Sequence, residues 1–101
     1  MAKRKIIWTK TAVAERLAIL EYWINRNKSK YFSIKLNALI QESLERLAKN
    51  PKIGRNTDFS KVRVKIVKNY LLFYKFNNEE LIVLSLWDGR RHEKSLKINE
   101  T

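Results

Sequence analysis

After a short apolar run at 5–9, the apolar residues of this chain change their spacing at Asn50 and Pro51. They recur at helical intervals before this point, and strand-like runs follow it. Proline has no backbone donor and pushes the residue before it out of the helical region, so a helix that reaches this point must end. Helices that precede a group of strands favour an α+β fold, in which the helices cover one face of a sheet.

Two helices are predicted before the proline. The first, over 11–27, carries its apolar stripe at Val13, Leu17, Leu20 and Ile24, widened by Ala14 and Ala18. Thr11 is its candidate N-cap. The second helix, over 29–49, keeps the same period through Leu36, Leu39, Ile40, Leu44 and Leu47. Only a few polar residues join the two helices, so we expect an antiparallel hairpin.

Strands are predicted on either side of the hairpin. Residues 5–9 are rich in Ile and Trp, which is typical of a strand. After the proline, Val62, Val64 and Ile66 alternate with Arg63 and Lys65, which indicates one buried and one solvated face. Strands over 70–76 and 81–87 follow, and the second is apolar enough to be central in the sheet. The predicted order is β-α-α-β-β-β, with the hairpin packed on a mainly antiparallel sheet.

The chain is strongly basic: 22 Lys and Arg stand against 10 Asp and Glu, a net charge of +12. Such a domain is expected to bind an anionic partner. The candidate anion- or partner-binding residues form two clusters along the chain. The first lies between the proline and the first strand that follows it, and within that strand: Lys52, Arg55, Lys61, Arg63 and Lys65. The second follows the last strand: Arg90 and Arg91. We expect a meander of three strands to join the clusters into one patch; the alternative is a solvated face that only aids solubility.

Other chemistry is sparse in this sequence. His92 is the only histidine, and it is either a general acid or base or a surface residue in a polar stretch. The chain has no cysteine, no metal-ligand spacing and no glycine-rich phosphate loop, so we expect neither a metal nor another cofactor. No apolar run reaches the length of about 20 residues that a membrane span needs, and we expect a cytoplasmic protein without a membrane partner.

Several short motifs follow one another in a specific order. They are Ile7-Trp8, Ala12, Leu17, Ile19, Tyr22-Trp23, a Pro-x-x-Gly-Arg turn at Pro51, Gly54 and Arg55, Val62-Arg63, the run 70–74, the run 82–84 and the run 87–91. This order resembles the RelE/ParE superfamily of toxins from bacterial type II toxin–antitoxin modules, and it is closer to the ParE-like branch. The resemblance covers about residues 6–96, the core of a single toxin domain over 1–101. The sequence departs from ParE-like chains at Trp87, where a histidine is common.

The resemblance implies a growth-inhibiting toxin that a cognate acidic antitoxin neutralises. The ParE-like branch is associated with inhibition of DNA gyrase by binding, without catalysis. The RelE-like alternative is a ribosome-dependent mRNA endonuclease, in which Arg63, Arg90, Arg91 and His92 would be catalytic. Such ribonucleases often use a tyrosine near the C-terminus, and this chain has none after Tyr74. The remaining interpretation is a basic binding module, a decayed toxin without activity.

Overall fold

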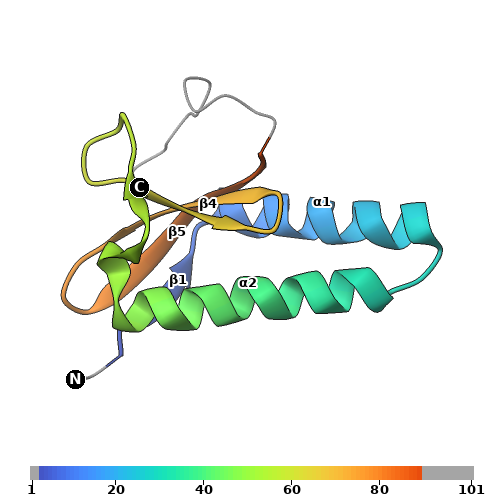
Figure 1. Cartoon of the computed structure of the whole chain (residues 1–101), viewed down its shortest axis with the longest axis horizontal. Helices are drawn as coiled ribbons and strands as arrows, with labels where there is room; N and C mark the ends of the chain where they lie inside the picture. The colour runs from blue at the N-terminus through green and yellow to red at the C-terminus, as the bar shows by residue number, and fades with distance from the viewer. Residues whose placement is uncertain (1–2, 90–101) are drawn as a thin grey trace.

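The structure is a computed structural model that describes residues 3–89 (Figure 1). Its elements are β1 (Lys5–Trp8), α1 (Lys10–Asn27), α2 (Tyr31–Lys49), the 3₁₀ turn η1 (Pro51–Ile53), β2 (Arg55–Asn56), β3 (Arg63–Val67), β4 (Tyr70–Phe76) and β5 (Glu80–Asp88). The predicted α+β fold is confirmed. The two-residue strand β2 is an addition, because a segment this short has no periodicity to read.

The strands form one mixed sheet in the order β1-β5-β4-β3-β2. Strand β1 pairs in parallel with β5, from Lys5 opposite Glu80 to Trp8 opposite Val83, and the other neighbours are antiparallel. The helix hairpin supplies part of the long connection that a parallel pair requires. Strand β5 therefore has a neighbour on each side, which confirms its prediction as a central strand.

The helix hairpin lies along one face of the sheet (Figure 1). Its start differs from the prediction, because Thr9 rather than Thr11 is the N-cap of α1. The Oγ1 of Thr9 accepts a hydrogen bond from the backbone of Ala12 at 3.2 Å and lies 3.0 Å from the carbonyl of Val83, to which it can donate. The cap thus joins the start of α1 to β5, a contact that the local sequence could not reveal.

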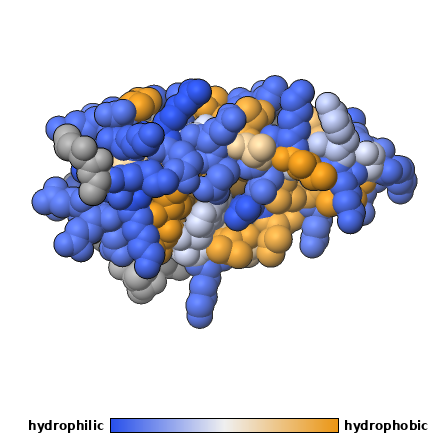
Figure 2. Space-filling view, turned by 90° about the horizontal axis from the view of Figure 1, so that it is seen from below, coloured by the Kyte–Doolittle hydropathy of each residue, from blue (hydrophilic) through white to orange (hydrophobic). Residues whose placement is uncertain are grey.

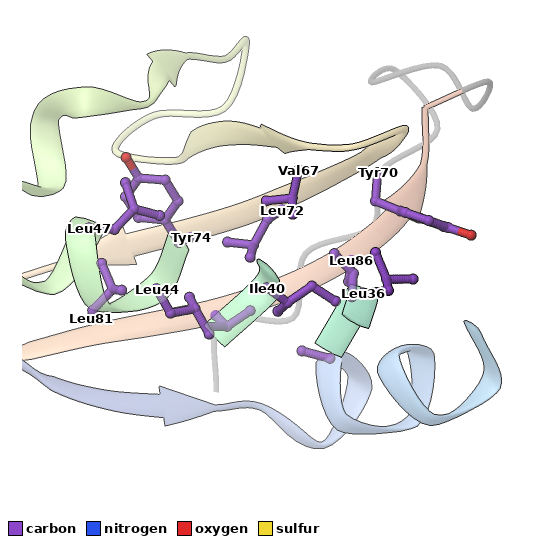
Figure 3. Packing of buried hydrophobic residues seen from close by; sticks show 12 residues of the cluster. Leu36, Ile40, Leu44, Leu47, Val67, Tyr70, Leu72, Tyr74, Leu81 and Leu86 are labelled. Carbon is purple, nitrogen blue, oxygen red and sulfur yellow. The ribbon is translucent and has the colours of Figure 1, made fainter. Parts of the chain in front are cut away.

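The main core lies between α2 and the sheet (Figure 3). Leu36, Ile40, Leu44 and Leu47 form the buried face of α2, as predicted. They pack in one cluster with side chains of the sheet that include Leu72, Tyr74, Leu81 and Leu86. Full burial of such a side chain contributes roughly 1.5–3 kcal/mol to stability. A second cluster, built on Val62, Val64, Phe73, Leu84 and Trp87, lies on the opposite face.

The prediction for β3 is wrong in part. Val64 is buried, but Ile66 is 59% exposed, and Arg63 and Lys65 are half-buried. The register explains this, because Arg63 stands opposite Tyr74 and shares its face, where the hairpin packs. On the other face, Phe59 packs against the cluster that contains Val64.

Candidate partner-binding surfaces

The outer side of α1 is an apolar stripe that no described element covers. Val13 is 40% exposed, Leu17 54% and Tyr22 52%. The sequence prediction placed Val13 and Leu17 on the buried face, and this is wrong. The helix lies beside α2 and β5 and buries mainly its other side, where Ala12 is fully buried. Apolar side chains therefore remain on the solvent side of α1.

A groove of about 900 Å³ begins where this stripe ends. Its walls are the second half of α1, the turn between β3 and β4, and the end of β5. The lining residues are Ala18, Ile19, Tyr22, Trp23, Arg26, Ile66, Lys68, Asn69, Tyr70, Leu71, Asp88 and Gly89. Seven of these twelve residues are apolar or aromatic, which is the usual character of a site that binds an apolar group.

Aromatic contacts hold the α1 wall of the groove in place. The indole Nε1 of Trp23 donates a hydrogen bond of 2.7 Å to the hydroxyl of Tyr70, which links α1 to β4. The Trp23 ring packs on Phe32 of α2, with 4.7 Å between ring centroids, and the Tyr22 ring meets it edge-on at 5.1 Å. Figure 3 shows the Tyr70 hydroxyl pointing away from the other labelled core side chains. The groove is thus largely formed without a ligand.

Positive charge flanks the groove on two sides. Arg26 comes from the last turn of α1, with its guanidinium 5.9 Å from the Trp23 ring centroid. Lys68 comes from the β3–β4 turn, where it adopts a left-handed backbone conformation with φ of 57°. The lining also holds the carboxylate of Asp88, so its cations outnumber its acids by two to one, and this apolar, mainly positive surface suits a ligand that is apolar in part and acidic in part.

A second surface is the basic edge, which we define as Lys52, Arg55, Lys61, Arg63 and Lys65. Lys52, Arg55 and Lys61 are exposed and lie on η1, on β2 and in the loop between β2 and β3. Strand β2 pairs only with the first two residues of β3. The outer edge of the rest of β3 therefore has no partner strand among residues 3–89.

Arg63 is tied into the turn that carries the Pro-x-x-Gly-Arg motif. Its Nη1 donates to the carbonyl of Gly54 at 2.7 Å and more weakly to that of Lys52 at 3.4 Å. On the same turn, the Tyr74 hydroxyl donates to the Pro51 carbonyl at 2.5 Å and accepts from the Gly54 amide at 3.0 Å. Burial raises the pKa of the Tyr74 phenol above its ordinary value. Sequence reasoning found the turn but missed this tyrosine, which reads as one more apolar residue in β4.

The remaining candidates, Arg90, Arg91 and His92, lie outside the described residues. The prediction that a three-stranded meander brings the cluster at 52–65 next to Arg90 and Arg91 is not supported by the strand directions. The first and third strands of a meander run in the same direction, and the register places Arg63 level with Tyr74 and Val83 but Val67 level with Tyr70 and Asp88. The amide of Gly89 donates to the Asn69 carbonyl at 2.6 Å. The described chain therefore ends beside the β3–β4 turn, at the groove.

Among residues 3–89, no three His, Asp or Glu side chains gather in a way that would hold a metal ion. Within the same residues, no helix is both long enough and apolar enough to cross a membrane.

Comparison with known proteins identifies relatives of the whole fold. The family described as the ParE toxin of the type II toxin–antitoxin system, parDE, matches residues 6–93. Among solved structures, a chain of the chromosomal ParDE TA system from P. aeruginosa matches with a TM-score of 0.72 and 19% sequence identity, over 85% of this chain and 96% of that one. No curated protein matches. The structural likeness establishes a shared fold.

Proposed function

This chain belongs to the ParE toxin family of type II toxin–antitoxin systems, and from that membership we propose that it stops growth by binding DNA gyrase and is neutralised by a cognate acidic antitoxin. The match over residues 6–93 is the observation that carries the proposal. The chain acts as one toxin domain over 1–101. We assign the target contact to the basic edge, and Arg90 and Arg91 are separate candidates for it that lie outside the described residues.

Binding is favoured over RNA cleavage by the state of two side chains. A tyrosine that assists cleavage must reach the substrate, but Tyr74 is buried and its hydroxyl is bonded to Pro51 and Gly54. Arg63 is bonded to the same turn. A ribosome-dependent endonuclease would therefore depend on Arg90, Arg91 and His92 for stabilisation of the cleaved phosphate and for proton transfer.

The groove and the outer stripe of α1 support the proposed antitoxin contact. Exposed Leu17 and Tyr22 would be covered by the apolar residues of an antitoxin segment. Acidic residues of the same segment would meet Arg26 and Lys68 at the sides of the groove. The net charge of +12 would accelerate the approach of an acidic chain and orient it.

Expression of the full chain in bacterial cells tests the target. We expect growth arrest, inhibition of supercoiling when the purified protein is added to DNA gyrase, and no cleavage of mRNA on ribosomes. The His92→Ala variant should stay toxic, and Arg90→Ala should lose most toxicity. Cleaved mRNA that disappears with His92→Ala would overturn the proposal in favour of the endonuclease. If neither the wild type nor any variant is toxic, the remaining interpretation is a decayed toxin that acts only as a binding module.

The antitoxin contact is tested with the small acidic protein encoded beside the toxin gene. Leu17→Glu places a carboxylate on the outer stripe of α1, and we expect it to weaken the complex about tenfold or more. Ile34→Glu is the matched control, because Ile34 is an exposed apolar residue of α2 and does not belong to the outer stripe of α1. Equal losses in both variants, measured by calorimetry, would contradict a specific contact at α1.

A further inference from the structure

A second recess lies at the opposite end of β4 from the groove. Arg4, Lys49, Asn50, Pro51, Lys52, Ile53 and Phe76 line an open volume of about 760 Å³, which we call the notch. Strand β4 begins in the groove at Tyr70 and ends in the notch at Phe76. At the rise of a strand, these two positions are about 20 Å apart. The notch is therefore a separate surface.

Three cations converge on the notch from three segments of the chain. Arg4 precedes β1, Lys49 ends α2, and Lys52 lies in η1. Among residues 3–89, no acidic side chain lines the notch; Glu45, which forms an ion pair with Lys3, lies outside the lining and acts on Lys49 only through its charge. The cluster thus carries a local positive charge that no described carboxylate neutralises by direct contact.

The notch is rigid on both of its sides. The Nε of Arg4 donates to the Asn77 carbonyl at 2.6 Å, and its guanidinium lies 5.3 Å from the Phe76 ring centroid. On the other side, the bonds from Tyr74 and Arg63 fix the turn that carries Lys52. A site that is already ordered loses little conformational entropy when it binds a ligand.

The floor of the notch is apolar. Pro51 is buried, Phe76 is half-buried, and Ile53, which follows Lys52 in the chain, leaves 51% of its surface exposed. Figure 2 shows hydrophilic side chains over most of the end of the molecule where α2 finishes, whereas apolar ones gather mainly over the hairpin. Ile53 is therefore an exposed apolar residue in basic surroundings, and its ligand must match both properties.

We propose that the notch binds an acidic peptide segment of a partner protein, with carboxylates at Arg4, Lys49 and Lys52 and an apolar side chain between them on Ile53. Nucleic acid fits less well, because Arg4 already covers one face of the Phe76 ring, the only aromatic surface on which a base could stack here. A second copy of this chain is disfavoured, since its own charge is +12. The proposal does not depend on which target the toxin inhibits.

Nuclear magnetic resonance titration of the isotope-labelled full chain tests the notch. The probe is the blocked tripeptide acetyl-Glu-Leu-Glu-amide, and the control peptide is acetyl-Gln-Leu-Gln-amide. We expect shifts of the amides of Lys49, Lys52, Ile53 and Phe76 with the acidic probe and at least tenfold weaker binding of the control. Absence of binding, or shifts centred on the groove, would overturn the proposal.

Two variants identify the residues responsible. Lys49→Glu combined with Lys52→Glu should weaken binding of the acidic probe about tenfold. The control, Lys28→Glu combined with Lys30→Glu, makes an equal change of charge at the hairpin tip and should leave this binding unchanged. Ile53→Ser should weaken the Glu-Leu-Glu probe but not acetyl-Glu-Gly-Glu-amide. Circular dichroism spectra show whether each variant is folded. If the oligonucleotide dT6 binds more tightly than the acidic peptide, and Ile53→Ser does not affect its binding, the notch is a nucleic-acid site and the peptide proposal is overturned.

Discussion

The hydroxyl of Tyr74 occupies the space that a side chain at position 54 would need. A Cβ placed on Gly54 would collide with this hydroxyl and would lie 2.8 Å from the Val64 carbonyl. The glycine is thus required for close approach and not for an unusual backbone angle, since its φ is −69°. The turn after α2 and strand β4 are consequently held together by one phenol.

Substitution of Gly54 by Ala tests this relationship. We expect a loss of about 1–3 kcal/mol in the free energy of unfolding, because a tightly packed site cannot absorb the added methyl group. Urea denaturation measures the loss. Adding Tyr74→Phe should recover part of the steric cost, since it removes the colliding oxygen. A stable Gly54→Ala protein would contradict the close packing.

Arg63→Lys separates charge from hydrogen bonding at the turn. Lysine keeps the positive charge but cannot reproduce the guanidinium bond to Gly54, so we expect a loss of about 0.5–1.5 kcal/mol in stability. The matched control is Lys65→Arg on the same face of β3, which should change stability by no more than about 0.5 kcal/mol. If Arg63→Lys is neutral in urea denaturation, Arg63 is free to serve a partner instead.

The phenol of Tyr74 should ionise at a higher pH than an ordinary tyrosine side chain. Burial raises its pKa, so the folded state holds the proton more tightly than the unfolded state does. The resulting stabilisation is complete below the ordinary tyrosine pKa of about 10 and is lost as pH rises through the higher folded value. Ultraviolet titration of the wild type and of Tyr74→Phe gives two curves, and their difference measures the ionisation of the Tyr74 phenol. A difference curve centred at the ordinary pKa would refute the prediction.

The bond between Trp23 and Tyr70 should contribute to the shape of the groove. Tyr70→Phe removes the acceptor for the indole of Trp23 and should cost about 1 kcal/mol. Because the two rings fix α1 against β4, the tryptophan fluorescence spectrum should also shift. Tyr31→Phe is the control, since Tyr31 is exposed at the start of α2. Identical spectra for wild type and Tyr70→Phe would argue against the link.

The start of α1 offers a direct comparison of two threonines. Thr9→Ala removes the N-cap and the contact with Val83, and we expect a loss of about 0.5–2 kcal/mol. Thr11→Ala should be nearly neutral, because Thr11 is exposed and lies inside the helix. Thermal unfolding ranks the two variants. The reverse ranking would restore Thr11 as the cap.

The sequence predicted the elements well because each carries a local pattern. The helix over 31–49 and the strand over 80–88 are examples, since their apolar spacing reflects direct burial. In α1, the sequence pattern could not distinguish the buried apolar residues from the exposed ones, because apolar residues occur on more of that helix than the side that packs against the core. Val13 and Leu17 were therefore placed inside when they lie outside.

The candidate sites depend more on long-range contacts, and these were predicted less well. The alternation of Arg63 and Lys65 placed them on one face correctly, but the face is the one that packs against the hairpin. The notch joins Arg4 to Lys49 and Lys52, more than 40 residues away along the chain. Sequence periodicity cannot predict that residues so far apart in the chain line one recess, because their proximity depends on the topology of the sheet.

The pairing of β1 with β5 has a consequence for the order in which the protein is made. Residue Lys5 finds its partner only when Glu80 has been synthesised, and Trp8 only when Val83 has. A chain that ends after Phe76 can complete the hairpin and the antiparallel pair β3–β4, but it lacks the strand that lies between β1 and β4. Pairing across so long a stretch of chain is slow. The toxin therefore closes its sheet only after β5 has been made, and a ribosome that stops before β5 releases an incomplete fold.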